Sequence, residues 1–275
     1  MASTNSDGSR WRLEDIDLDR ADTGCVKRDE ALLLLLAASS FVETASPVYA
    51  RNLIQHFAED PEIAGWLARQ WEPEEVQHGR VLRAYIARAW PDFGWVRAYA
   101  GFFRDYTSRC TQEELEPQRG LEMVARCVVE TGTSALYRAI HDYANDPVLK
   151  SIAGYISSDE INHFKHFYRY FKKYHLRDGH TRVQVLSTLL RRTIELRRED
   201  ADCGLRHAFM ERYRRRALDQ AFFCEMEAKV SAMVKRHYAF DMAAKMLLKP
   251  LLLPHRVEAL IGRPIVLAGR WIAFG

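Results

Sequence analysis

The sequence predicts an all-α protein built around a bundle of long helices. Between residues 28 and 174 glycine and proline are scarce, and apolar residues recur at steps of three and four. Segments with the alternation of a β-strand are almost absent. Helices of about 28 residues would be about 40 Å long at about 1.5 Å per residue, which is the size of a long-helix bundle. We therefore expect a four-helix bundle with a crossover helix and additional C-terminal helices.

The expected helices are separated by proline-containing or polar breaks, at Asp60-Pro61, Trp90-Pro91-Asp92, the polar run around Pro117, and Asn145-Asp146-Pro147. The helices themselves are expected over residues 28–58, 62–90, 94–110 (the crossover), 118–145, 147–175, 181–199 and 203–247. This divides the chain into a polar N-terminal segment over 1–27, the bundle over 28–178, and a helical extension over 179–275 that packs on the bundle. The last part of the extension, 247–275, is apolar but broken by prolines, and the sequence leaves its role open.

Composition predicts a cytoplasmic location. The five cysteines are odd in number, widely spaced and form no Cys-x-x-Cys pair, which favours a reducing compartment over a disulfide framework. The N-terminal residues MASTNSDGSR lack the apolar core of a secretory signal. The longest apolar run, over 31–38, is much shorter than the ~20 residues that span a bilayer.

A glutamate followed about thirty residues later by a Glu-x-x-His pair occurs twice in the sequence. On the expected helices these residues share the stripes that carry the apolar side chains, so they should face the core. The six residues are Glu43, Glu75, His78, Glu130, Glu160 and His163.

Four buried carboxylates in one core require compensating positive charge, because unpaired buried charges are costly and would repel one another. Two divalent ions would balance the four negative charges and leave the histidines neutral. Carboxylate and imidazole ligands suit iron or manganese, whereas structural zinc sites more often use thiolates. One glutamate from each of two helices and a Glu-x-x-His from each of two others is the ligand pattern of ferritin-like di-iron bundles. We therefore expect two iron ions, with a manganese–iron pair as the alternative.

Around these motifs the sequence resembles the soluble acyl-acyl-carrier-protein desaturases over roughly residues 31–174. The stretches that carry the resemblance are WEPEEVQHGRVLRAY, ISSDEINHFKHFY and ETGT. The resemblance implies that Asp159 hydrogen-bonds the histidine ligand His78 and fixes its tautomer. It also implies that Thr133 lies beside the oxygen-binding face, where its hydroxyl would relay protons as a catalytic residue. The alternative for Asp159 is an ordinary surface or capping carboxylate. The alternative for Thr133 is a core hydroxyl bonded to the carbonyl one turn back.

The resemblance implies an O₂-dependent di-iron oxidase or desaturase that acts on an acyl chain bound to an acyl carrier protein, in a homodimer. No Gly-x-Gly-x-x-Gly motif is apparent, so an external electron donor such as a ferredoxin is expected, and no nucleic-acid partner. Residues 165–216 contain 15 Lys or Arg and six Asp or Glu, which makes an acidic docking partner plausible at Arg214, Arg215 and Arg216.

Two other functions remain open from the sequence. The first is a di-iron oxygenase of a free small molecule, such as an aldehyde, a quinone or an aromatic compound. The second is a non-catalytic iron-binding protein or a ferroxidase. Leu82 stands where ribonucleotide reductase small subunits carry the radical tyrosine, and Ile156 stands where the arylamine N-oxygenases carry a third histidine, which argues against these two classes.

Overall fold

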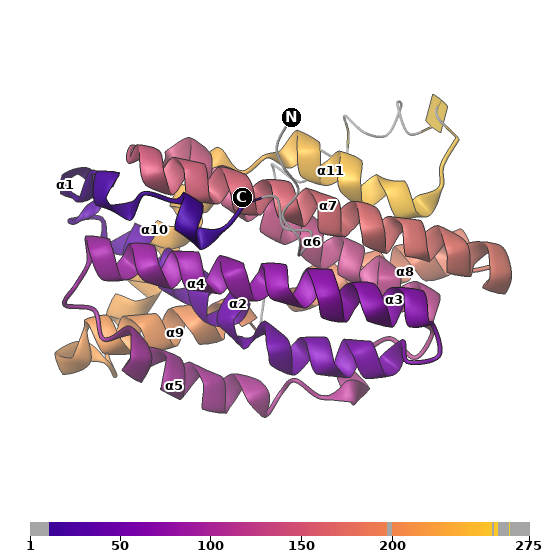
Figure 1. Ribbon diagram of the computed structural model, residues 1–275, viewed down its shortest axis with the longest axis horizontal. Coiled ribbons are helices and arrows are strands. Elements are labelled where there is room, and N and C mark those ends of the chain that lie inside the picture. Colours follow the sequence, from indigo (N-terminus) through magenta and orange to yellow (C-terminus); the bar gives the residue numbers. More distant parts are fainter. Residues whose placement is uncertain (1–10, 197–199, 255, 258–263, 265–275) are drawn as a thin grey trace.

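The computed structural model describes residues 11–196, 200–254, 256–257 and 264 (Figure 1). These residues form helices and no β-strand, so the prediction of an all-α fold is confirmed. The α-helices are α1 (Thr23–Val26), α2 (Glu30–His56), α3 (Pro61–Trp66), α4 (Glu72–Ala89), α5 (Trp95–Thr107), α6 (Arg119–Tyr143), α7 (Pro147–Asp178), α8 (Arg182–Leu196), α9 (Asp200–Arg212), α10 (Gln220–His237) and α11 (Phe240–Leu248).

Four long helices, α2, α4, α6 and α7, run along the longest axis of the molecule (Figure 1). Helix α2 packs on α4, α6 packs on α7, and α4 contacts α7, which joins the two pairs. The bounds of these helices lie within a few residues of the predicted ones, except at the start of α4. The four-helix core is therefore assembled from two antiparallel helix pairs.

Local sequence explains where the long helices begin and end. The Asp29 carboxylate accepts a hydrogen bond from the Leu32 amide at 3.0 Å and caps α2, and Asp146 accepts one from the Leu149 amide at 3.0 Å and caps α7. Helix α7 ends at Gly179, whose φ of 69° lies in the left-handed region that glycine adopts without a steric penalty.

The single helix expected over 62–90 is interrupted by a π-helical segment, Leu67–Trp71, between α3 and α4. Pro73 lies two residues after this segment and has no amide hydrogen, so the carbonyl of Arg69 lacks its usual helical partner. A π turn inserts one extra residue and changes which side chains face the core beyond it. The segment therefore sets the rotation of α4 one turn before Glu75.

Helix α5, the expected crossover, lies against α2 on the outer side of the bundle (Figure 1). Trp95 at its start donates a hydrogen bond from Nε1 to Ser40 Oγ at 2.8 Å and packs edge-on against Phe41. Helix α9 packs on both α5 and α2 and so extends this layer.

The prediction of one long helix over 203–247 is wrong, because this part forms α9, α10 and α11. Tyr213 leaves the helical conformation with φ −116° and ψ 48°, and Asp219 starts a new helix by accepting a hydrogen bond from the Phe222 amide at 3.0 Å. Tyr238, with ψ 130°, makes the second break. Helices α8, α10 and α11 contact α6, while residues 255, 258–263 and 265–275 of the predicted C-terminal segment lie outside the described residues.

The apolar core has two parts, one toward each end of the bundle. The first includes Leu33, Leu82 and Ile156, and the second includes Leu53, Val124 and Phe167. The six glutamates and histidines singled out by the sequence lie between these two parts along the helices. A layer of ionisable side chains thus lies between the two apolar parts of the core.

Helix α2 is the one helix of the described part that is long and apolar enough by composition to cross a bilayer. Its most apolar window is 72% buried inside the protein, against α4, α5 and α9. A core helix meets the same length and composition criteria as a membrane span. In the structure this apolar surface is used for packing.

Candidate metal centre

The structure brings the six predicted residues together in the middle of the bundle, from four different helices. Each is at least nine-tenths buried, although all are ionisable. Their exposed fractions are 0% for His78, 1% for Glu130, Glu160 and His163, 5% for Glu43 and 9% for Glu75. Burial of this many charged groups requires close partners or a bound cation.

The six residues form two overlapping groups that could each hold a metal ion. In each group every residue offers one ligand atom, and these atoms lie within 4.8 Å of one another. The first group is Glu43, Glu75, His78 and Glu160, and the second is Glu75, Glu130, Glu160 and His163. Glu75 and Glu160 belong to both groups, so these two carboxylates could contribute a ligand atom to either group.

Four of the candidate ligand atoms in this cluster have no hydrogen-bond partner in the protein. His78 Nδ1 lies 3.3 Å from Glu160 Oε1, and His163 Nδ1 lies 3.1 Å from Glu75 Oε1. These four buried atoms nevertheless make no hydrogen bond of acceptable geometry. Buried polar atoms are rarely left unsatisfied, and a group of them directed at one point is what a metal ion would satisfy. The residues therefore fit divalent metal ions.

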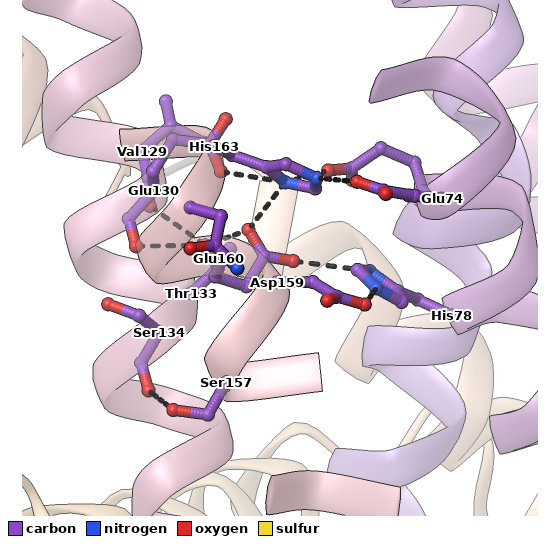
Figure 2. A network of polar contacts seen from close by, with 12 residues as sticks. Glu74, His78, Val129, Glu130, Thr133, Ser134, Ser157, Asp159, Glu160 and His163 are labelled. Carbon is purple, nitrogen blue, oxygen red and sulfur yellow. Dashed lines mark hydrogen bonds and ion pairs between the residues drawn. The ribbon is translucent and has the colours of Figure 1, made fainter. Parts of the chain in front are cut away.

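The outer nitrogens of both histidines are bonded to carboxylates (Figure 2). His78 Nε2 donates to Asp159 Oδ2 at 3.2 Å, as the resemblance implies, and His163 Nε2 donates to Glu74 Oε2 at 2.7 Å. With the proton on Nε2, each Nδ1 keeps its lone pair for a metal ion. The two bonds are crossed, because each histidine is held by the acid that precedes the other Glu-x-x-His motif.

Glu74 was not predicted from the sequence, although a signal was present. An acidic residue stands directly before the glutamate of both motifs, in EEVQH and in DEINH. Asp159 was identified through the resemblance alone. The repetition of an acid at this position would have indicated Glu74 as well.

Trp11 also belongs to the site, although the sequence placed it in a polar N-terminal segment. It is 4% exposed and donates from Nε1 to Asp159 Oδ2 at 2.7 Å. Its ring is parallel to that of His78, with centroids 6.1 Å apart. Asp159 Oδ2 therefore accepts two hydrogen bonds, one from His78 and one from Trp11.

Thr133 lies at the edge of the centre on α6 (Figure 2). Its hydroxyl is 2.9 Å from Glu160 Oε2 and 3.1 Å from the Val129 carbonyl oxygen one turn back. A hydroxyl has one proton, so it can donate to one of these acceptors at a time. Both roles considered for Thr133, contact with the centre and a bond to its own helix, are geometrically available.

The buried carboxylates strongly perturb one another's protonation. Burial and the charges of Glu160 and Glu43 hold the pKa of Glu75 well above its ordinary value. Burial and the charge of Glu160 raise the pKa of Glu130 to about 8. Burial alone would also raise the pKa of Glu160, but the imidazole rings of His163 and His78 beside this carboxylate outweigh burial and place that pKa well below its ordinary value.

The pKa values of both histidines are raised, although burial by itself would lower them. Burial by itself would lower the pKa of His78, but the hydrogen bond to Asp159 and the close carboxylate of Glu160 raise it well above its ordinary value. Burial would also lower the pKa of His163, but the carboxylates of Glu130, Glu160 and Glu74 around it raise that pKa well above its ordinary value. Bound protons thus supply positive charge among the carboxylates, and a metal ion that bound here would have to displace them.

Arg214, Arg215 and Arg216, the predicted docking residues, are exposed and lie apart from the centre, in a short turn after α9. Arg216 pairs with Asp219 at 2.7 Å, and Arg214 lies 3.7 Å from Glu211. The neighbouring Arg212 binds Glu30 at the start of α2, which is about 20 Å along the helix from Glu43 at about 1.5 Å per residue. The basic turn therefore lies near one end of the bundle.

Comparison with known proteins leaves the function to be argued from this geometry. No protein-family model matches the chain, and no curated protein matches it. The likeness to the desaturases therefore remains one of short sequence stretches around the six residues.

Proposed function

We propose that the chain is a ferritin-like di-iron protein that catalyses an O₂-dependent oxidation or desaturation of an acyl chain. The observation that carries the proposal is the pair of overlapping ligand groups in the bundle core, with unsatisfied ligand atoms directed inward. Two Fe²⁺ ions would balance the four carboxylates, and the neutral histidines would complete the ligand set. A manganese–iron pair would satisfy the same charge.

Bound iron would supply the reduction of O₂, which no amino-acid side chain can perform. The protein's own residues have other tasks. Asp159 and Glu74 hold the histidine rings in position, and the apolar core on both sides keeps water from the centre. The Thr133 hydroxyl can pass a proton to or from Glu160 Oε2 across their 2.9 Å contact.

An acyl chain bound to an acyl carrier protein is the substrate we propose, with electrons from an external donor such as a ferredoxin. Both partners would present acidic surfaces, and the exposed Arg214–Arg216 turn offers a complementary basic one. Charge reversal of all three arginines should slow turnover and weaken its dependence on salt. Unchanged turnover and salt dependence in that variant would remove the docking role.

A second candidate is a protein that binds or oxidises iron without an organic substrate. Two surface clefts are present on the described part, one lined by residues that include His56, Arg119 and His180, and one by residues that include Arg51 and Glu72. None of the six ligand residues lines either cleft. A ferroxidase needs only ligand groups and a path for ions, and the two ligand groups by themselves meet the first requirement.

The metal content of the purified protein tests the centre first. Protein from iron-rich medium should contain two iron ions per chain, and Glu75→Ala and Glu160→Ala should both lose them because each residue belongs to both ligand groups. Glu114→Ala, at an exposed position, should keep both ions. A well-folded parent without bound metal would refute the proposal.

Product analysis then separates the candidates. Oxygen consumption that needs a carrier-bound acyl chain and a reductant supports the oxidase, and conversion of free aldehydes, quinones or aromatic compounds supports a small-molecule oxygenase. Oxygen consumption driven by Fe²⁺ alone supports the ferroxidase.

A further inference from the structure

The centre has an internal two-fold repeat in which α2 and α4 correspond to α6 and α7. Glu43 corresponds to Glu130, and the Glu-x-x-His motif of α4 corresponds to that of α7. The crossed bonds from His78 to Asp159 and from His163 to Glu74 obey the same repeat. By this symmetry alone the two metal positions would be equivalent.

The repeat is broken seven residues after the first glutamate of each half. On α6 this position is Tyr137, which is 1% exposed and donates from its hydroxyl to Glu43 Oε1 at 2.5 Å. On α2 the corresponding position is Ala50, whose methyl group cannot donate a hydrogen bond to Glu130. One terminal carboxylate of the centre therefore has a tyrosine partner that the repeat does not provide for the other.

The hydrogen bond determines how Glu43 can bind a metal ion. Its Oε1 is occupied by Tyr137, while its Oε2 faces the ligand atom His78 Nδ1 at 3.8 Å. Glu43 can therefore offer one oxygen without breaking a short, charge-assisted bond. Glu130 Oε2 lies 3.5 Å from His163 Nδ1, and among the described residues no hydrogen bond from a tyrosine to this carboxylate is found.

We infer that Tyr137 is a positioning residue that makes the two metal positions unequal. It holds Glu43 as a ligand through one oxygen at the position of His78, whereas Glu130 is free to change its binding mode at the position of His163. This inference rests on the proposed metal centre. It adds that the affinity for a metal ion at the His78 position depends on Tyr137, which is not a ligand. The affinity at the His163 position does not depend on Tyr137.

Binding of Co²⁺ to the metal-free protein, followed by calorimetry and visible absorption, tests the inference. Tyr137→Phe keeps the ring and removes the hydroxyl. Loss of a group that orients a ligand weakens metal binding by about 10- to 100-fold, and we expect this for one of the two ions only. His78→Ala and His163→Ala identify which absorption bands belong to which position, and the bands lost in Tyr137→Phe should be those lost in His78→Ala.

Tyr143→Phe is the matched control. Tyr143 lies on the same helix and also donates to a carboxylate at 2.5 Å, but its partner is Asp29 at the start of α2. This variant should bind both ions as the parent does.

A double variant separates positioning from a general effect on folding. If Tyr137 acts through Glu43, adding Tyr137→Phe to Glu43→Ala should change the remaining Co²⁺ affinity less than twofold. Equal weakening of both ions, or no weakening of either in Tyr137→Phe, overturns the inference. In both cases a parent that binds two ions leaves the proposed centre intact, whereas a parent that binds none refutes the centre itself.

Discussion

The metal-free protein should become less stable as the pH rises from about 5 to 8, and Glu130→Gln should remove much of this dependence. Burial raises the pKa of Glu130 to about 8 from its ordinary 4.5. Between these pH values the folded state holds a proton that the unfolded chain releases, so its stabilising effect is complete below pH 4.5 and is lost as pH rises through 8.

The size of the effect follows from the shift. One bound proton changes the free energy of unfolding by about 1.4 kcal/mol per pH unit, so the whole window corresponds to on the order of 5 kcal/mol. The raised pKa values of Glu75, His78 and His163 act in the same direction. The lowered pKa of Glu160 acts in the opposite direction, but in a window below its ordinary 4.5, where its stabilising effect is lost as pH falls.

Urea unfolding followed by circular dichroism, in the presence of a chelator at pH 5.5, 6.5, 7.5 and 8.5, measures the dependence. At pH 8.5 Glu130→Gln should be more stable than the parent, because the neutral amide needs no proton. Exposed Glu114 provides the control, since Glu114→Gln should follow the parent at each pH. A metal-free parent whose stability rises with pH over this range would refute the reasoning.

Three further predictions concern the same centre. The affinity for iron or cobalt should increase from pH 6 to 8, because binding displaces protons from Glu75 and Glu130. A pH indicator should record the release of these protons. Equal affinity at both pH values would contradict this prediction. Gly79→Ala should destabilise the protein by about 1–3 kcal/mol in thermal unfolding, because the new Cβ would lie 2.7 Å from the Thr44 amide nitrogen. At Gly132 a new Cβ meets nothing within 4 Å, so Gly132→Ala should be neutral or stabilising. Trp11→Phe should lower metal affinity by about tenfold in competition with a chelator, since Asp159 loses its indole donor, and parent-like affinity would exclude a role for the indole.

The cluster of six glutamates and histidines and the four long helices could be predicted because both depend on local periodicity. Glu75 and His78 lie three residues apart on one helix face, and proline-containing breaks separate the helices that carry the other ligands. The residues around the ligands were harder to identify. A tyrosine seven residues after Glu130 is equally compatible with ordinary apolar packing, and the bond from Tyr137 to Glu43 joins residues 94 positions apart.

The breaks between the C-terminal helices could not be predicted from the sequence for a different reason. No proline interrupts residues 203–247, so a single helix was the natural prediction. The break after Arg212 accompanies long-range contacts, since Arg212 and Tyr213 both bind Glu30 at the start of α2. Helix propensity could not anticipate a turn whose partners lie more than 180 residues away.

The crossed carboxylate–histidine bonds also bear on how such a site could arise. A single α2–α4 hairpin contains Glu74 and His78, but the partner of each lies on α7. An ancestral hairpin of this kind could have completed the site only by pairing with a second copy of itself, so that each copy oriented the histidine of the other. Fusion of two copies into one chain would then have allowed position 137 to become tyrosine while position 50 stayed small, and one symmetric site could acquire two different halves.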